Sequence, residues 1–231
     1  MRVLLVAPRK NDLHAVDEEI QDIYRSGLQV TPIVGKVTAA ELAREIRSGE
    51  YDVLWLATHG DDAGIELSGL ERISASELVP MVRGRFSLVV LNTCNGLGIA
   101  QMLQEEANVG VICALVGIGD NVAYQFGSRL ATALAETNSV SDAYLASKPG
   151  RNANYLYLPA LRQTQQSIEN LLMELKNLKA EIERLRAEMQ LERERERRQE
   201  RRWWLMVATL LVVFYPAAWF LMWAIVSRFQ P

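Results

Sequence analysis

Short apolar runs alternate with helical patterns through the first two thirds of this 231-residue chain, and this alternation restricts its fold more than any other feature. The apolar runs, rich in β-branched residues, cover residues 3–7, 28–34, 53–57, 88–92 and 109–117. Segments with helical periodicity cover residues 16–24, 38–46, 74–82, 98–107 and 121–136. Short strands that alternate with helices pair in parallel, and near-continuous apolar strands are buried on both faces. The pattern predicts an α/β fold in which helices sandwich a mostly parallel sheet.

Charge is distributed unevenly along the chain. The 25 Lys and Arg residues are outnumbered by 28 Asp and Glu, which excludes nucleic-acid binding through bulk positive charge. Residues 1–159 contain 13 basic and 19 acidic side chains, whereas residues 160–202 contain 11 and 9. The remaining residues contain a single Arg. We therefore expect a globular domain at 1–159, a charge-rich stalk at 160–202, an apolar segment at 203–226 and a short tail at 227–231.

The stalk carries apolar side chains at alternating spacings of three and four residues. They are Ile168, Leu171, Leu175, Leu178, Ile182, Leu185 and Met189. Such a heptad repeat favours a coiled coil, and hence a homo-oligomer. A lone amphipathic helix packed against the globular domain is the alternative. Beyond Met189 the series stops, and the charged sequence LERERERRQERR continues the helix.

Residues 203–226 contain no Asp, Glu, Lys, Arg or His, and roughly 20 predominantly apolar residues suffice to cross a bilayer. This segment predicts one C-terminal transmembrane helix, with a buried hairpin as the alternative. Arginines precede it and a short tail follows, so the expected protein is a tail-anchored, single-pass cell-membrane protein with its N-terminal domain in the cytoplasm. The first residues, MRVLLVAPRKND, resemble a strand and not a signal peptide. In such a compartment Cys94 and Cys113 are expected to be thiols.

Polar residues follow the third and fourth predicted strands. Thr58, His59 and Gly60 come after the strand at 53–57, and Thr93 and Cys94 come after the strand at 88–92. Ligand and catalytic groups gather beyond the carboxyl ends of parallel strands. If the two strands are neighbours, His59 can take the thiol proton and generate the reactive Cys94 thiolate. The backbone N–H groups of Gly60 and Cys94 are candidates for an oxyanion hole.

Each residue also has a structural interpretation, since a cysteine at a strand end can be a small buried residue and His-Gly can form a turn. The matched occurrence on successive strands, in a chain with two His and two Cys, favours a functional pair. His14 is expected at the surface and Cys113 in the core.

The sequence DVLWLATHG, followed by LVVLNTCNG and then VGVICALVGIGDNVAYQFGSRLATALAETNSVSDAYLAS, resembles the CHAT domains. These are caspase-like members of the clan of caspases, separases and gingipains, and the resemblance covers roughly residues 1–147. It implies a caspase-type α/β sandwich with His59 as general base and Cys94 as nucleophile. It also implies a cysteine endopeptidase that acts on protein or peptide substrates. A further implication is an effector role in prokaryotic defence or programmed death, controlled by a separate sensor protein.

Specificity in this clan usually depends on a buried charge. Asp120 is a candidate partner for a basic substrate side chain, with Asp61 and Asp62 as rivals, although all three also suit turns or helix caps. The sequence indicates neither a cofactor nor a metal. Two other functions remain open: a catalytically silent assembly module, and a membrane-disrupting effector switched by its head domain.

Overall fold

The structure of the chain is a computed structural model that describes residues 1–8, 15–137, 139–148 and 154–227, without the side chains of residues 213 and 216–227. The chain divides into two compact units, Met1–Ser167 and Ile168–Pro231. The first is an α/β unit that contains the candidate site. The second belongs to one long helix. His14, which was expected at the surface, lies outside the described residues.

A six-stranded sheet, in the order β2-β1-β3-β7-β8-β9, forms the centre of the α/β unit. Its strands are β1 (Arg2–Pro8), β2 (Gln29–Gly35), β3 (Val53–Ala57), β7 (Leu88–Asn92), β8 (Gly110–Ala114) and β9 (Tyr155–Leu158). All neighbours pair in parallel except β8 and β9, which are antiparallel. β3, β7 and β8 are buried along their whole length, as their apolar sequences predict. The expected α/β fold with a mostly parallel sheet is confirmed.

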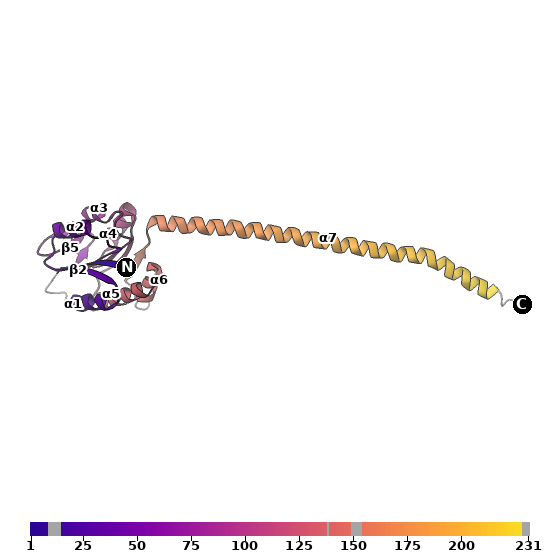
Figure 1. The fold of residues 1–231 in the computed structure, drawn as a ribbon, viewed down its shortest axis with the longest axis horizontal. Helices are drawn as coiled ribbons and strands as arrows, with labels where there is room; N and C mark the ends of the chain where they lie inside the picture. Colours follow the sequence, from indigo (N-terminus) through magenta and orange to yellow (C-terminus); the bar gives the residue numbers. More distant parts are fainter. Residues whose placement is uncertain (9–14, 138, 149–153, 228–231) are drawn as a thin grey trace. The chain divides into compact units, whose positions relative to one another are not determined.

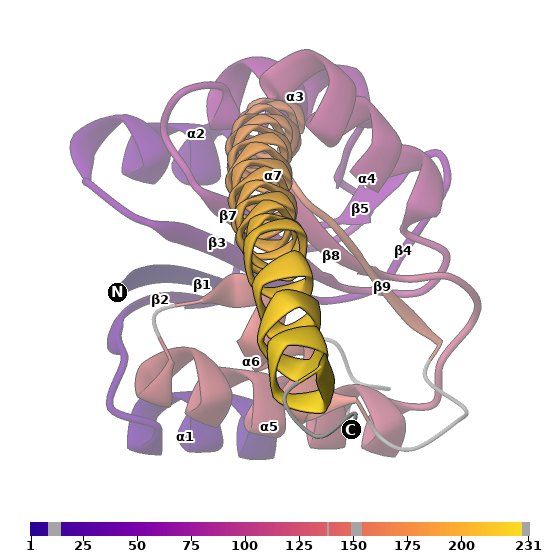
Figure 2. The same ribbon diagram turned by 90° about the vertical axis from the view of Figure 1, so that its right-hand side faces the viewer.

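Helices cover both faces of this sheet (Figure 2). One face carries α2 (Ala39–Ser48), α3 (Ala75–Val82), α4 (Leu97–Met102) and the π-helical turn η1 (Leu103–Ala107). The other carries α1 (Val16–Arg25), α5 (Asp120–Glu136) and α6 (Val140–Ser147). The N-caps fit the sequence: the Thr38 side chain accepts the N–H of Glu41, and Ser74 and Glu77 form a capping box.

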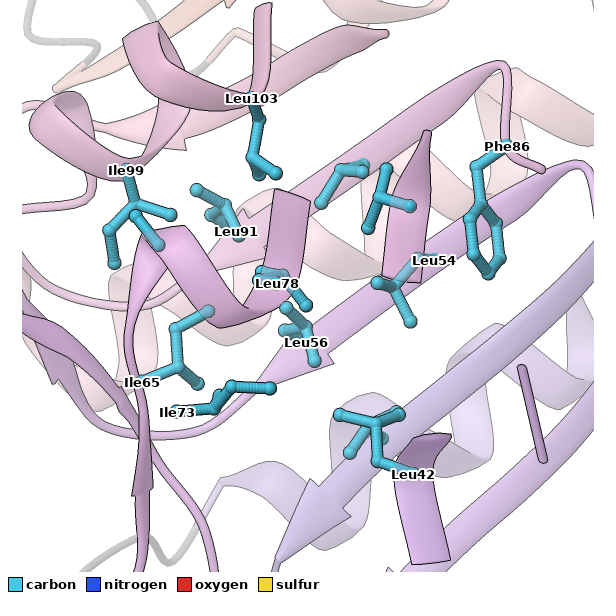
Figure 3. Close-up of a cluster of buried hydrophobic side chains, with 14 of the residues drawn as sticks. Leu42, Leu54, Leu56, Ile65, Ile73, Leu78, Phe86, Leu91, Ile99 and Leu103 are labelled. Atoms are coloured by element: carbon cyan, nitrogen blue, oxygen red, sulfur yellow. The ribbon is translucent and has the colours of Figure 1, made fainter. Parts of the chain in front are cut away.

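The core has two layers because successive residues of a strand point to opposite faces. In β3, Leu54 and Leu56 join the cluster beneath α2, α3 and α4, whereas Val53 and Trp55 join the cluster against α1 and α5. Figure 3 shows the first cluster, in which Leu78 lies over the side chains from β3. Both faces of β3 are therefore buried, and this packing fixes the position of its C-terminal end.

Two features of the sheet region are absent from the sequence-based prediction. A small antiparallel sheet follows β3 directly and consists of β4 (Gly60–Asp61), β5 (Gly64–Glu66) and β6 (Arg72–Ile73). The edge strand β9 is the second. Both consist of strands of two to four residues, too short to produce a recognisable alternation in sequence.

Helix α7 (Leu161–Ser227) is continuous over 67 residues and is drawn from orange to yellow in Figure 1. The helix expected for residues 160–202 is therefore present. Its seven heptad side chains are each 50% to 65% exposed in the single chain. The coiled coil itself stays a prediction.

The predicted transmembrane helix at residues 203–226 is corrected by the structure. Within the residues whose placement is described, no helix is long and apolar enough to cross a membrane. The described side chains of this segment end at Tyr215. The side chains of the second half of the segment, and the tail at 228–231, lie outside the description.

Candidate active site

β3 and β7 bring His59 and Cys94 to the same edge of the sheet. The strands are parallel neighbours, and Ala57 is paired with Asn92 at their carboxyl ends. His59 and Cys94 each follow two residues later, and adjacent strands lie about 4.8 Å apart. Both side chains are partly exposed and line one pocket of about 190 Å³. The topology thus places both predicted catalytic residues at the same edge of the sheet and in the lining of one pocket.

A tight turn after β7 presents Cys94 to this pocket. Asn95 adopts a left-handed conformation with φ of 49°, which a residue with a side chain rarely adopts. The N–H of Gly96 donates to the Ala114 carbonyl at 2.9 Å, so the turn is fastened to the end of β8. The Cys94 Sγ accepts the N–H of Ile118 at 3.4 Å. These contacts fix the position of the Cys94 sulfur beside the turn.

Gly60 packs directly against the residue that precedes Cys94. A Cβ atom added at Gly60 would lie 3.1 Å from Thr93 Oγ1 and 3.3 Å from the Gly64 carbonyl oxygen. The hairpin after His59 is held by the His59 carbonyl, which accepts the N–H of Glu66 at 2.9 Å. The absence of a side chain at Gly60 therefore allows the histidine loop and the cysteine turn to lie in contact. The candidate oxyanion donors, the N–H groups of Gly60 and Cys94, belong to these two segments.

Thr93 itself contains an unusual group. Its Oγ1 is buried, and among the residues that the structure describes it has no hydrogen-bond partner. Such a group costs about 1–3 kcal/mol of stability. By contrast, the hydroxyl of Thr58, at the matching position after β3, donates to the Glu66 carbonyl at 2.9 Å.

A buried polar network, absent from the predicted site, lies beneath the pocket. Glu19 of α1 is 2% exposed, and its Oε1 accepts hydrogen bonds from Trp55 Nε1 at 3.1 Å and Asn92 Nδ2 at 2.7 Å. Asn92 Nδ2 also donates to the Ala123 carbonyl at 3.1 Å, and Asn92 Oδ1 accepts the Tyr155 hydroxyl. The network therefore ties α1, β3, α5 and β9 to the end of β7, two residues before Cys94.

Burial raises the pKa of Glu19 from 4.5 to about 8, and the nearby charge of Asp120 adds to the rise. The hydrogen bonds from Asn92 and Trp55 oppose it. Gly127 of α5 makes room for this carboxyl, since a Cβ atom there would overlap Glu19 Oε1. One signal in the sequence could have revealed the burial of Glu19. Val16, Ile20 and Ile23 define the apolar face of α1, and position 19 falls on that face.

The three candidate specificity residues have different surroundings. Asp120, the first residue of α5, lines the pocket with His59 and Cys94, and its Oδ2 accepts the N–H of Ala15 at 2.8 Å. Asp61 pairs with Arg72 and accepts the N–H groups of Ala63 and Gly64, which lower its pKa.

Asp62 is exposed and lies beside Gly98, whose added Cβ would be 3.4 Å from Asp62 Oδ1. Among the residues described around the pocket, Asp61 and Asp62 are not part of the lining. Asp61 therefore acts as a turn residue of the hairpin, which is the structural alternative expected for it.

The second cysteine is chemically distinct from Cys94. Both cysteines are free thiols, as expected. Cys113 lies within β8, is fully buried, and has its pKa raised by burial to about 12. A thiol in that environment is inert, so the expected core role of Cys113 fits its surroundings. The described part of the chain contains no cluster of His, Cys, Asp and Glu side chains that could hold a metal ion.

No protein-family model matches the sequence, and no curated protein matches it. Among solved structures, the chain is similar to the pyridoxal kinase from Staphylococcus aureus in complex with pyridoxal. The identity is 8% and the TM-score 0.37, over 63% of this chain and 84% of the kinase chain. These values are too low to assign a fold family or an activity.

Proposed function

We propose that the α/β unit is a cysteine peptidase of the CHAT type, in which Cys94 is the nucleophile and His59 the general base. The observation that carries this proposal is the matched placement of the two residues beyond adjacent parallel strands, where both line one pocket. The left-handed turn at Asn95 supports it, because sparsely populated backbone conformations cluster at functional sites. The resemblance supplies the setting, an effector whose activity is controlled by a separate sensor.

The proposed reaction is acyl transfer through a thioester. His59 takes the thiol proton, and the Cys94 sulfur attacks the carbonyl carbon of the scissile peptide bond. The tetrahedral intermediate carries its negative charge on the carbonyl oxygen, where the N–H groups of Gly60 and Cys94 stabilise it. His59 then gives its proton to the departing amine, and the acyl group stays on Cys94. Finally, His59 accepts a proton from water, which attacks the thioester and releases the carboxylic acid. The departing Cys94 sulfur takes this proton back from His59, which restores the starting state.

The pocket beside Cys94 suits a single amino-acid side chain. Its volume of about 190 Å³ lies below the roughly 300–1,000 Å³ of sites for drug-sized ligands and cofactors. Asp120 lines it and carries a carboxylate, so a basic side chain before the scissile bond is the favoured substrate. Glu19 also lines it, but its raised pKa keeps this carboxyl largely protonated at neutral pH. Asp120→Asn is expected to lower cleavage after Lys or Arg at least tenfold relative to cleavage after a neutral residue.

A thiol-reactive peptide probe tests the nucleophile on the full chain. We expect the probe to label Cys94, identified by mass spectrometry of the modified peptide, and labelling to vanish in Cys94→Ala. Cys113→Ala is the matched control and should be labelled like the wild type, because that thiol is buried within β8. His59→Ala should retain Cys94 but react at least a hundredfold more slowly at neutral pH, in line with the usual contribution of a general base.

Two outcomes would contradict the proposal. Labelling and peptide cleavage that survive Cys94→Ala would exclude Cys94 as the nucleophile. Equal rates in His59→Ala and the wild type would exclude His59 as the base. Near-UV circular dichroism of each variant checks that the α/β unit is folded.

A further inference from the structure

We infer that the apolar seam of α7 is the interface of a parallel, in-register, two-stranded coiled coil with a second copy of this chain. The seam consists of the seven heptad side chains named above, from Ile168 to Met189. Each is between 50% and 65% exposed in the single chain, so one continuous apolar face is uncovered. This inference does not depend on the proposed peptidase activity.

The residue types along the seam favour two strands. Written as heptads, the a positions hold Ile168, Leu175, Ile182 and Met189, and every d position between them holds leucine. Isoleucine at a combined with leucine at d is the pattern of parallel dimers, whereas isoleucine at both positions shifts the preference to larger assemblies. The seam ends where the next d position holds Glu192. Its 22 residues span about 33 Å at 1.5 Å per residue.

The charges beside the seam select the orientation. The g positions hold Glu174, Glu181 and Glu188, and the e positions hold Lys179, Arg186 and Arg193. In a parallel pair in register, each g residue faces the e residue five positions later on the partner helix, and such pairs set partner and orientation. Every one of these contacts then joins a glutamate to a lysine or an arginine. An antiparallel pair would instead place glutamate against glutamate and basic residue against basic residue.

Two details of the helix are compatible with this arrangement. The e position of the first heptad holds Leu172, but the g position that would face it holds Ser167, so no like-charge contact arises there. In the single chain Glu188 pairs with Arg184 along the helix at 3.1 Å, and both side chains are more than half exposed. Such an exposed intrahelical pair is weak and does not prevent Glu188 from also meeting Arg193 of a second copy. The parallel arrangement joins both α/β units to the same end of the coiled coil.

Complementary charge reversal on the full chain tests the pairing. One variant carries Glu174→Lys, Glu181→Lys and Glu188→Lys, and the other carries Lys179→Glu, Arg186→Glu and Arg193→Glu. Mass is measured by multi-angle light scattering in mild detergent, which covers the exposed apolar side chains after residue 202. We expect a dimer for the wild type, a monomer for each variant alone, and a dimer for their equimolar mixture. Far-UV circular dichroism of each variant checks that the helix persists.

Engineered cysteines test the register in a Cys94→Ala background. Leu171→Cys near one end of the seam should form an intermolecular disulfide on oxidation, because parallel helices place it opposite itself. Mixing Leu171→Cys with Leu185→Cys should give no 171–185 disulfide, since only antiparallel helices bring these positions together. A monomeric wild type, a trimer or tetramer, a 171–185 disulfide, or charge variants that dimerise alone like the wild type would each overturn the inference. Leu175→Asp with Leu178→Asp should give a monomer, and a persistent dimer would show that the chains associate elsewhere.

Discussion

Replacing Glu19 with glutamine should remove a specific dependence of stability on pH. Glu19 is buried in the α/β unit with its Oε1 accepting hydrogen bonds from Trp55 and Asn92. A glutamine Oε1 can accept both bonds, and the side chain is neutral, so Glu19→Gln imitates the protonated carboxyl. The substitution therefore removes the ability of this side chain to ionise and changes little else.

The sign of the effect follows from the raised pKa. Between pH 4.5 and about 8 the folded chain keeps the Glu19 proton while the unfolded chain loses it. The folded state binds more protons there, so the free energy of unfolding falls as the pH rises. A tenfold change in proton affinity corresponds to about 1.4 kcal/mol, which makes the loss about 3 kcal/mol at pH 7 relative to pH 4.5. Relative to strongly acidic pH, where Glu19 is protonated in both states, the loss approaches about 5 kcal/mol above pH 8 and then levels off.

The measurement is the free energy of unfolding in denaturant at several pH values, followed by near-UV circular dichroism of the α/β unit. Wild type and Glu19→Gln should be similarly stable near pH 4.5, and the variant should become the more stable protein as the pH rises to 8. Subtracting the two curves cancels other titrating groups, including Asp61 and Glu77, whose lowered pKa values act at lower pH. Glu18→Gln, on the exposed side of the same helix turn, is the matched control and should follow the wild type. Parallel curves for wild type and Glu19→Gln would refute a buried, protonated Glu19.

Three further substitutions test the packing around the site. Thr93→Val removes the unpaired hydroxyl and should raise the free energy of unfolding by about 1 kcal/mol. Thr58→Val breaks a formed hydrogen bond and should lower the free energy of unfolding by about as much. A change of the same sign in both variants would contradict these two assignments. Gly127→Ala should destabilise the chain by about 2 kcal/mol in denaturant unfolding, because the new methyl group displaces the Glu19 carboxyl, and an equally stable variant would show that the carboxyl is not held there. Gly60→Ala should slow probe labelling of Cys94 several-fold by separating the two site loops, while Gly98→Ala, whose methyl group makes only ordinary contact, should leave the rate unchanged. Equal labelling rates of these two glycine variants would argue against the close packing of Gly60 on Thr93.

The fold was largely predictable because strand burial leaves a strong periodic signal. β3 and β7 are apolar at every position but the last residue of β7, and their observed bounds match the predicted runs. Because almost every position of these buried strands is apolar, the polar residues Thr58 and Thr93 mark the transition to the loops. The short strands β4, β5, β6 and β9 gave no such signal because they contain two to four residues each. The transmembrane prediction relied on the apolar run at residues 203–226 and the arginines before it, whereas no helix among the described residues is long and apolar enough to cross a membrane.

The site was only half predictable, for a related physical reason. His59 and Cys94 stand out because each lies two residues beyond the end of an apolar strand, where catalytic groups are expected in a parallel sheet. Glu19 does not stand out, because a helix surface normally carries acidic residues and α1 has others in its first turn. What distinguishes Glu19 is a set of partners far away in sequence: Trp55 and Asn92 donate to it, and Gly127 leaves the space for it. A buried polar group needs partners from several elements, so its presence is a property of the assembled sheet and helices, and only the three-dimensional structure reveals it.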